Sequence, residues 1–233
     1  MVVISSFTRH TLRASRRIQI RALSTLESAP YIYVFPNPKA PAESHILSLL
    51  PTEPPNHELA IGTCSKLPPT PDSFEENPRF LRILQEVLAE HAHKDPDVIS
   101  HARIMASTAG ANLGSGGVFF APPSRRRRPG YGGGGGAGGD SSGGASAQGG
   151  VGSGGRGGWI HVSDSRNPPE YGRTAWPEDI FGSLEVDANG DFVGENGNYQ
   201  PSGTYRIVTR NGILGLSPFL REKLVERLRA QES

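Results

Sequence analysis

The stretch TYRIVTRNGILGLSPFL, residues 204–220, carries the clearest local signals in this sequence. Asn211-Gly212 stands between two apolar, β-branched runs, 204–209 and 213–216, and Asn-Gly in that setting is the strongest short-range signal for a β-hairpin. Ser217-Pro218 then offers a helix start, with serine as the N-cap and proline at the first helical position. We therefore predict a hairpin followed directly by a helix.

This final helix is expected to end near Ala230 and to have one apolar face, formed by Leu220, Leu224 and Leu228. Upstream, residues 159–162 and 181–186 read as strands, and 187–191 as the turn after the second strand. Residues 159–233 are therefore predicted to form a compact α+β domain, a small antiparallel sheet with a covering C-terminal helix over 159–230.

A low-complexity stretch precedes this domain. Between Gly130 and Gly158, 17 of 29 residues are glycine, with serine and alanine among most of the others. A composition of this kind buries too little apolar surface to offset its conformational entropy. We expect residues 121–158 to be a disordered, Arg/Gly-rich linker.

Residues 24–120 are expected to form a Pro-rich segment that includes a helical hairpin at 78–107. The hairpin follows from two helix starts of the same kind, Asn77-Pro78 and Asp95-Pro96. Residues 31–35 read as a strand. For 36–75 the dense prolines indicate mostly extended coil, with a short helix near 42–50.

The first 23 residues have the composition of a mitochondrial presequence. They contain no Asp or Glu, are rich in Ser and Thr, and carry five arginines. Arg9, Arg13, Arg16 and Arg17 share one helical face, and the fifth is Arg21. We expect cleavage near Ser24 and delivery to the matrix; a plastid transit segment remains the alternative because its composition overlaps. Removing these arginines leaves 19 Lys+Arg against 23 Asp+Glu, a formal net charge of −4. The slight positive charge of the whole chain therefore does not indicate nucleic-acid binding.

Three blocks of the C-terminal part resemble an uncharacterised family of fungal mitochondrial proteins. The blocks are Trp176-Pro177-Glu178-Asp179-Ile180-Phe181-Gly182, Gly203-Thr204-Tyr205-Arg206-Ile207-Val208-Thr209 and Leu216-Ser217-Pro218-Phe219-Leu220. The resemblance covers mainly 159–230 and part of 60–120. It implies no activity, cofactor or site residue.

Signatures of cofactor or metal chemistry are not found in the sequence, and no cofactor is expected. Residues 152–157 fit G-x-G-x-x-G, but they lead into a strand and not into a helix. Cys64 is the single cysteine, which excludes an internal disulfide or a cysteine-based metal site within one chain. His91 and His93 lie two positions apart on a helix and so do not share a face. No run approaches the 18 apolar residues that a membrane span needs.

One acidic loop contains residues that could act in acid/base catalysis. Glu178-Asp179, with Glu170 and Arg173, has the residue types of an acid/base pair beside Trp176. Adjacent carboxylates on a loop are usually solvated, and we expect these to be so.

The leading hypothesis is a non-enzymatic accessory or assembly factor that binds an unknown protein partner through its C-terminal domain, besides the mitochondrial import and processing machinery. Exposed aromatic residues anchor such contacts, and the candidates are Trp159, Tyr171, Trp176 and Phe181. The second hypothesis is an RNA- or mitoribosome-associated protein that uses the arginine run Arg125, Arg126, Arg127 and Arg128 with the glycine-rich tract. The third is an enzyme whose site one sequence does not reveal.

Overall fold

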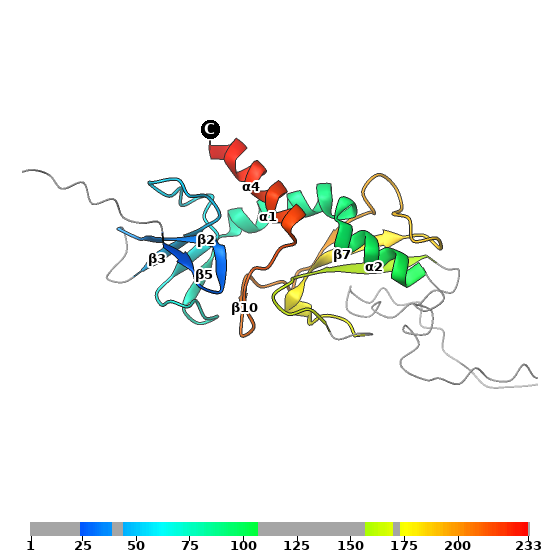
Figure 1. Cartoon of the computed structure of the whole chain (residues 1–233), viewed down its shortest axis with the longest axis horizontal. Coiled ribbons are helices and arrows are strands. Elements are labelled where there is room, and N and C mark those ends of the chain that lie inside the picture. Colours follow the sequence, from blue (N-terminus) through cyan, green and yellow to red (C-terminus); the bar gives the residue numbers. More distant parts are fainter. Residues whose placement is uncertain (1–23, 39–43, 107–156, 170–172, 233) are drawn as a thin grey trace, which may run out of the picture.

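The computed structural model describes residues 24–38, 44–106, 157–169 and 173–232 (Figure 1). Antiparallel sheets and helices, including a C-terminal helix, make it a mixed α+β fold. The predicted presequence, and all of the predicted linker except Gly157 and Gly158, lie outside the described residues. No helix in the described ranges is long and apolar enough to cross a bilayer.

The N-terminal part contains a five-stranded antiparallel sheet in which each strand pairs with the next in sequence. Its strands are β1 (Ser24–Leu26), β2 (Ala29–Pro36), β3 (His45–Ser48), β4 (Gly62–Cys64) and β5 (Phe74–Glu76). Strands β3, β4 and β5 interrupt the mostly extended coil predicted over 36–75, and the short helix predicted near 42–50 is wrong. Within this range His45–Ser48 form strand β3, because Leu47 pairs with Val34 on one side and Gly62 on the other.

Two helices follow this sheet, and side chains cap both. Helix α1 (Pro78–His91) begins after Asn77, whose Oδ1 accepts from the Arg79 amide at 3.0 Å. A short 3₁₀ turn, η1 (Ala92–Lys94), leads to α2 (Pro96–Ala106). The buried carboxylate of Asp95 accepts from the Asp97 amide at 2.8 Å, so it satisfies a free donor at the start of α2.

The second sheet has the order β6-β7-β8, formed by β6 (Gly158–Ser163), β7 (Ile180–Val186) and β8 (Gln200–Pro201). A 3₁₀ turn, η2 (Pro177–Asp179), directly precedes β7. The predicted turn at 187–191 forms around Asp187, whose Oδ1 accepts from the amides of Asn189 and Asp191. Gly190 has a φ of +87° in this turn and approaches Ala102 of α2 closely. Both the backbone conformation and the lack of space therefore disfavour a side chain at this position.

The C-terminal stretch forms the predicted hairpin and helix. The hairpin strands β9 (Val208–Thr209) and β10 (Gly212–Ile213) have two residues each, shorter than the apolar runs suggested. Helix α4 (Pro218–Glu232) begins after Ser217, whose Oγ accepts from the Leu220 amide at 3.1 Å. The three leucines predicted to face inward are all buried: Leu220, Leu224 and Leu228.

Most of the buried apolar side chains of both parts form one continuous hydrophobic cluster, and Phe35, Ile46 and Ala60 form a second, small one in the first sheet. Figure 1 shows α1 and α4 side by side between the two sheets. The cluster draws on the first sheet, on α1, on the second sheet and on α4, with fully buried members Ile32, Leu47, Leu84, Leu184 and Leu224. Arg227 of α4 also pairs with Glu90 of α1. The segments before and after the glycine-rich stretch therefore share a core.

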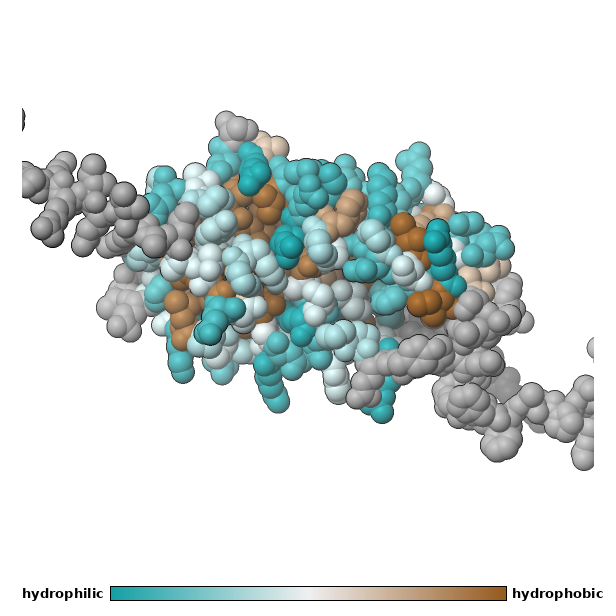
Figure 2. Space-filling model, viewed as in Figure 1, coloured by the Kyte–Doolittle hydropathy of each residue, from teal (hydrophilic) through white to brown (hydrophobic). Residues whose placement is uncertain are grey.

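Hydrophobic and hydrophilic residues are interspersed on the surface. On the face seen in Figure 2, the hydrophobic residues drawn in colour form several small patches separated by hydrophilic ones. Three large apolar side chains of the described residues are exposed: Leu67, Ile104 and Trp176. Single exposed apolar residues are ordinary on a folded surface, so each needs a separate reason before a function is assigned to it.

Candidate functional site

A buried group of charges lies between the end of β6 and the start of β7. We call Asp164, Arg166, Asp179 and Tyr205 the Arg166 cluster. Arg166 Nε donates to Asp179 Oδ1 at 2.7 Å and lies 3.6 Å from Asp164 Oδ2. Both carboxylates and the guanidinium are almost fully removed from solvent, with side-chain exposures of 0% for each aspartate and 3% for the arginine.

The guanidinium is bonded on several sides. Its Nη1 donates to the Ile207 carbonyl at 2.7 Å, and its Nη2 donates to the carbonyls of Glu178 at 2.9 Å and Arg206 at 2.7 Å. One side chain therefore holds three backbone segments together: the loop after β6, the η2 turn and the strand-like stretch before β9. Planar guanidinium groups with several fixed donors suit this role, and lysine does not.

Asp164 is satisfied mainly by backbone and hydroxyl donors. Its Oδ1 accepts from the amides of Gly215 at 2.8 Å and Arg166 at 2.9 Å, and its Oδ2 accepts from the Tyr205 hydroxyl at 2.9 Å. Burial raises the pKa of Asp164 to about 6, against the opposing effect of Arg166. Burial, with the Asp164 charge beside it, raises the pKa of Tyr205 as well. A Cβ on Gly215 would lie 2.8 Å from Asp164 Oδ1, so only glycine fits there.

The acidic loop differs from its sequence prediction. Asp179 is buried and paired with Arg166, so the expectation of a solvated side chain is wrong for this residue. Glu178 and Arg173 are exposed, and Glu170 lies outside the described residues. The cluster forms because Arg166, which precedes Asp179 by 13 positions in the chain, reaches its carboxylate.

Trp176 directly precedes the η2 turn, which ends at Asp179 of this cluster. Its side chain is 68% exposed, the largest exposed fraction among the large hydrophobic residues of the described ranges. Its own carbonyl accepts from the Asp179 amide at 2.8 Å, and the next carbonyl, of Pro177, accepts from Thr204 Oγ1 at 2.8 Å. The Arg206 amide donates to the Glu178 carbonyl at 3.1 Å. The exposed indole is thus carried by a backbone whose three carbonyls, at residues 176–178, all accept hydrogen bonds.

The other aromatic candidates are placed differently. Trp159 lies half-buried on β6. Phe181 is buried on β7 and packs on Tyr205, with ring centroids 4.5 Å apart, so it belongs to the core and offers no surface to a partner. Tyr171, Arg125–Arg128 and the five presequence arginines lie outside the described residues.

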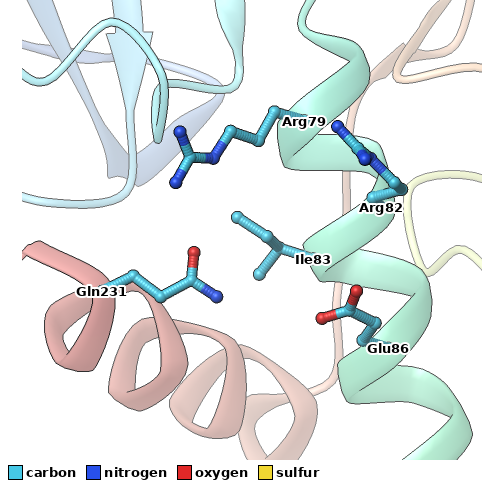
Figure 3. A pocket seen from close by; sticks show the side chains of 5 residues that line it. All are labelled: Arg79, Arg82, Ile83, Glu86 and Gln231. Atoms are coloured by element: carbon cyan, nitrogen blue, oxygen red, sulfur yellow. The ribbon is translucent and has the colours of Figure 1, made fainter.

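Two open clefts border α4, and several of their charged groups are already paired with other side chains. The first, of about 370 Å³, lies between α1 and the end of α4, where Gln231 points toward Ile83 (Figure 3). Of its charged lining residues, Arg79 pairs with Glu58 and Glu86 lies 3.9 Å from Arg227. The second, of about 410 Å³, lies between β2 and α4, where Arg221 sits 4.5 Å from the centre of the Tyr31 ring. Neither arrangement brings together a nucleophile with a base.

His91 and His93, the histidines considered as metal ligands, do not lie in a metal-binding arrangement within the described residues. His93 lies in η1 with its ring edge-on to Phe192, and burial lowers its pKa, which favours the neutral form. Within the described ranges, no group of three or more His, Cys, Asp or Glu is placed to hold a metal ion.

The raised pKa of Asp164 predicts a specific pH dependence of stability. Because the folded state holds this proton more tightly than the unfolded chain, the group's contribution to the unfolding free energy is full below the unfolded pKa of 3.8. It is lost as pH rises through the folded pKa of about 6. The loss should amount to at most about 3 kcal/mol. Urea unfolding of the parent and of Asp164→Asn, from pH 4 to 7, measures it: the parent's advantage over the variant should shrink as pH rises. Parallel pH profiles for the two proteins would contradict the assignment.

Comparisons of the chain with protein-family models, with curated proteins and with solved structures found no match.

Proposed function

We propose that this protein is a non-enzymatic accessory or assembly factor of the mitochondrial matrix that binds a protein partner through a surface centred on Trp176. The observation that carries the proposal is the contrast between an indole that is 68% exposed and a backbone fixed by the buried Arg166 cluster.

The energetics favour a binding role for this residue. Tryptophan is among the residues most enriched in the few positions that dominate binding energy. Covering the exposed part of its side chain contributes roughly 3 kcal/mol. Because the carbonyls of residues 176–178 are already held, little backbone entropy is lost when a partner covers the ring.

The immediate neighbours suit a polar rim around such an anchor. Pro177, Glu178, Thr204 and Arg206 are exposed, and hydrogen bonds join 177–178 to 204–206. An aromatic centre with an arginine and a carboxylate beside it resembles the usual composition of protein interfaces. The mitochondrial location rests on the acid-free, arginine-rich composition of residues 1–23.

Site-specific photo-cross-linking tests the proposal. The full chain, with a benzophenone amino acid replacing Trp176, is imported into isolated mitochondria and irradiated. A second chain carries the same group in place of Leu67, which is 38% exposed in a loop of the N-terminal part. We expect a discrete cross-linked protein from position 176 that position 67 does not give, and we expect it to persist after nuclease treatment.

The outcomes separate the parts of the proposal. Failure of import would refute the location. Import with equal or no cross-linking at the two positions would refute the Trp176 surface. A product at 176 that nuclease abolishes would favour the RNA-associated alternative.

A further inference from the structure

Strand β6 is the longest free edge in the described part of the fold. The order β6-β7-β8 leaves one side of its six residues without a neighbouring strand. The other edge strands are much shorter: β1 and β5 have three residues each and β8 has two. Proteins usually keep edges short because unpaired backbone groups bind other strands.

The hydrogen-bond pattern of β7 fixes which groups of β6 point outward. Glu185 of β7 bonds to Gly197 and Val193, on the side away from β6. In an antiparallel pair the bonding direction alternates, so Leu184 and Gly182 bond toward β6. Their partners are Ile160 and Val162. The amides and carbonyls of Trp159, His161 and Ser163 therefore point away from β7.

Nothing in the described ranges pairs with this outward row. Asp164, the next residue, turns back and donates to the Asp179 carbonyl at 2.7 Å. His161 Nδ1 lies 2.9 Å from Ser183 Oγ on β7, and its Nε2 is buried without a hydrogen-bond partner among the described residues. The strand also carries neither proline nor lysine, the usual means of blunting an edge.

We propose that a second copy of this chain pairs with β6 edge to edge in antiparallel orientation, with a two-fold axis at His161. In this register His161 lies opposite its own counterpart and exchanges both backbone hydrogen bonds with it. Trp159 lies opposite Ser163 of the other copy, and Ile160 lies opposite Val162. The two three-stranded sheets join into one sheet of six strands.

The residues of the edge favour a second copy because the strand is complementary to itself. A two-fold interface places the same patch on both sides, so any charge near the axis would face a like charge. The segment Trp159-Ile160-His161-Val162-Ser163 contains no carboxylate or ammonium group. Burial lowers the pKa of His161 and favours its neutral form. The Ile160–Val162 pairs place β-branched side chains in direct cross-strand contact.

Proline at position 161 tests the pairing. His161→Pro removes an outward amide and leaves the β6–β7 bonds intact, and edge strands accept proline in that orientation. His161→Ala removes the same imidazole but keeps the amide, so it is the matched control. In sedimentation equilibrium of the full chain we expect a dimer for the parent and for His161→Ala. We expect His161→Pro to raise the dimer dissociation constant about tenfold or more. A parent that stays monomeric, or equal behaviour of the two variants, would overturn the proposal.

A cysteine variant at the same position tests the pairing independently, should the proline variant misfold. Cα atoms of a directly opposed, hydrogen-bonded pair lie about 5.5 Å apart, within disulfide range. His161→Cys should therefore give a covalent dimer under mild oxidation, whereas Thr25→Cys on the other edge strand, β1, should not. The native Cys64 is buried and should not interfere. Absence of a covalent dimer from His161→Cys, or equal yields from both variants, would also refute the pairing.

Discussion

Replacing Arg166 with alanine is expected to lower the free energy of unfolding by about 3–5 kcal/mol, the usual cost of removing one partner from a buried ion pair. Asp179 would keep only the Asn167 amide, 3.1 Å from its Oδ2, as a side-chain donor while remaining out of contact with solvent. The carbonyls of Glu178, Arg206 and Ile207 would lose their guanidinium donors at the same time. An uncompensated buried charge costs far more than an exposed one.

Urea unfolding followed by tryptophan fluorescence measures this effect. Arg206→Ala makes the same chemical change at an exposed side chain and should stay within about 0.5 kcal/mol of the parent. Similar losses in the two variants would mean that the buried network contributes little to stability. Because the same guanidinium binds the Glu178 carbonyl and the Asp179 carboxylate, close to Trp176 in the chain, Arg166→Ala should also weaken the Trp176 cross-link in variants that remain folded.

Replacing Leu224 with alanine is expected to cost about 2–5 kcal/mol of unfolding free energy. Leu224 has no exposed surface and belongs to the cluster shared by both sheets and both long helices. Elements on all sides hold the surrounding residues in place, so the space left by the side chain collapses only in part. The loss should therefore include a cavity contribution beyond the transfer energy of the missing carbons.

The unfolding curve of the Leu224 variant distinguishes one shared core from two separate ones. With a shared core, circular dichroism and tryptophan fluorescence should report one coincident transition, shifted as a whole. Leu67→Ala, the same change at a partly exposed loop position, should cost under about 1 kcal/mol. Two separate transitions, of which only one moves, would show that the N-terminal and C-terminal parts unfold independently.

The helices follow from local chemistry, and the sequence therefore predicts where they begin. Asn77, Asp95 and Ser217 each precede a proline, and the structure gives each a hydrogen bond to an amide of the first turn. The signal needs only a few consecutive residues to be read. The hairpin around Asn211-Gly212 is local in the same sense, although its strands are short.

The first sheet depends on pairing between strands that are too short to be predicted from their own sequences. Strands β3, β4 and β5 have three or four residues, too few to show an alternating pattern, and prolines lie between them. Their extended form comes from neighbours such as Val34, which lies opposite Leu47. The proline density predicted mostly extended coil there, because it does not distinguish extended coil from the short strands of a sheet.

The Arg166 cluster was hidden for a related reason. The motif Asp164-Ser165-Arg166 after an apolar strand is a detectable signal, because an aspartate there caps a turn through the amide two residues later. The burial of Asp179 and the bond across to Ile207 depend on the closed fold. The residue type alone made Trp176 a candidate anchor, whereas the hydrogen bonds that hold the carbonyls of residues 176–178 could not be predicted from the sequence.

One contact has a consequence for fragments of this protein. The Ser217 hydroxyl, which caps α4, donates in turn to the Asp95 carboxylate that caps α2. A chain cut within the glycine-rich stretch would place these two residues on different molecules. Its C-terminal piece would retain the residues of α4 but lose Asp95 and the α1 surface on which that helix packs, so the last helix should persist only when the upstream piece is supplied in trans.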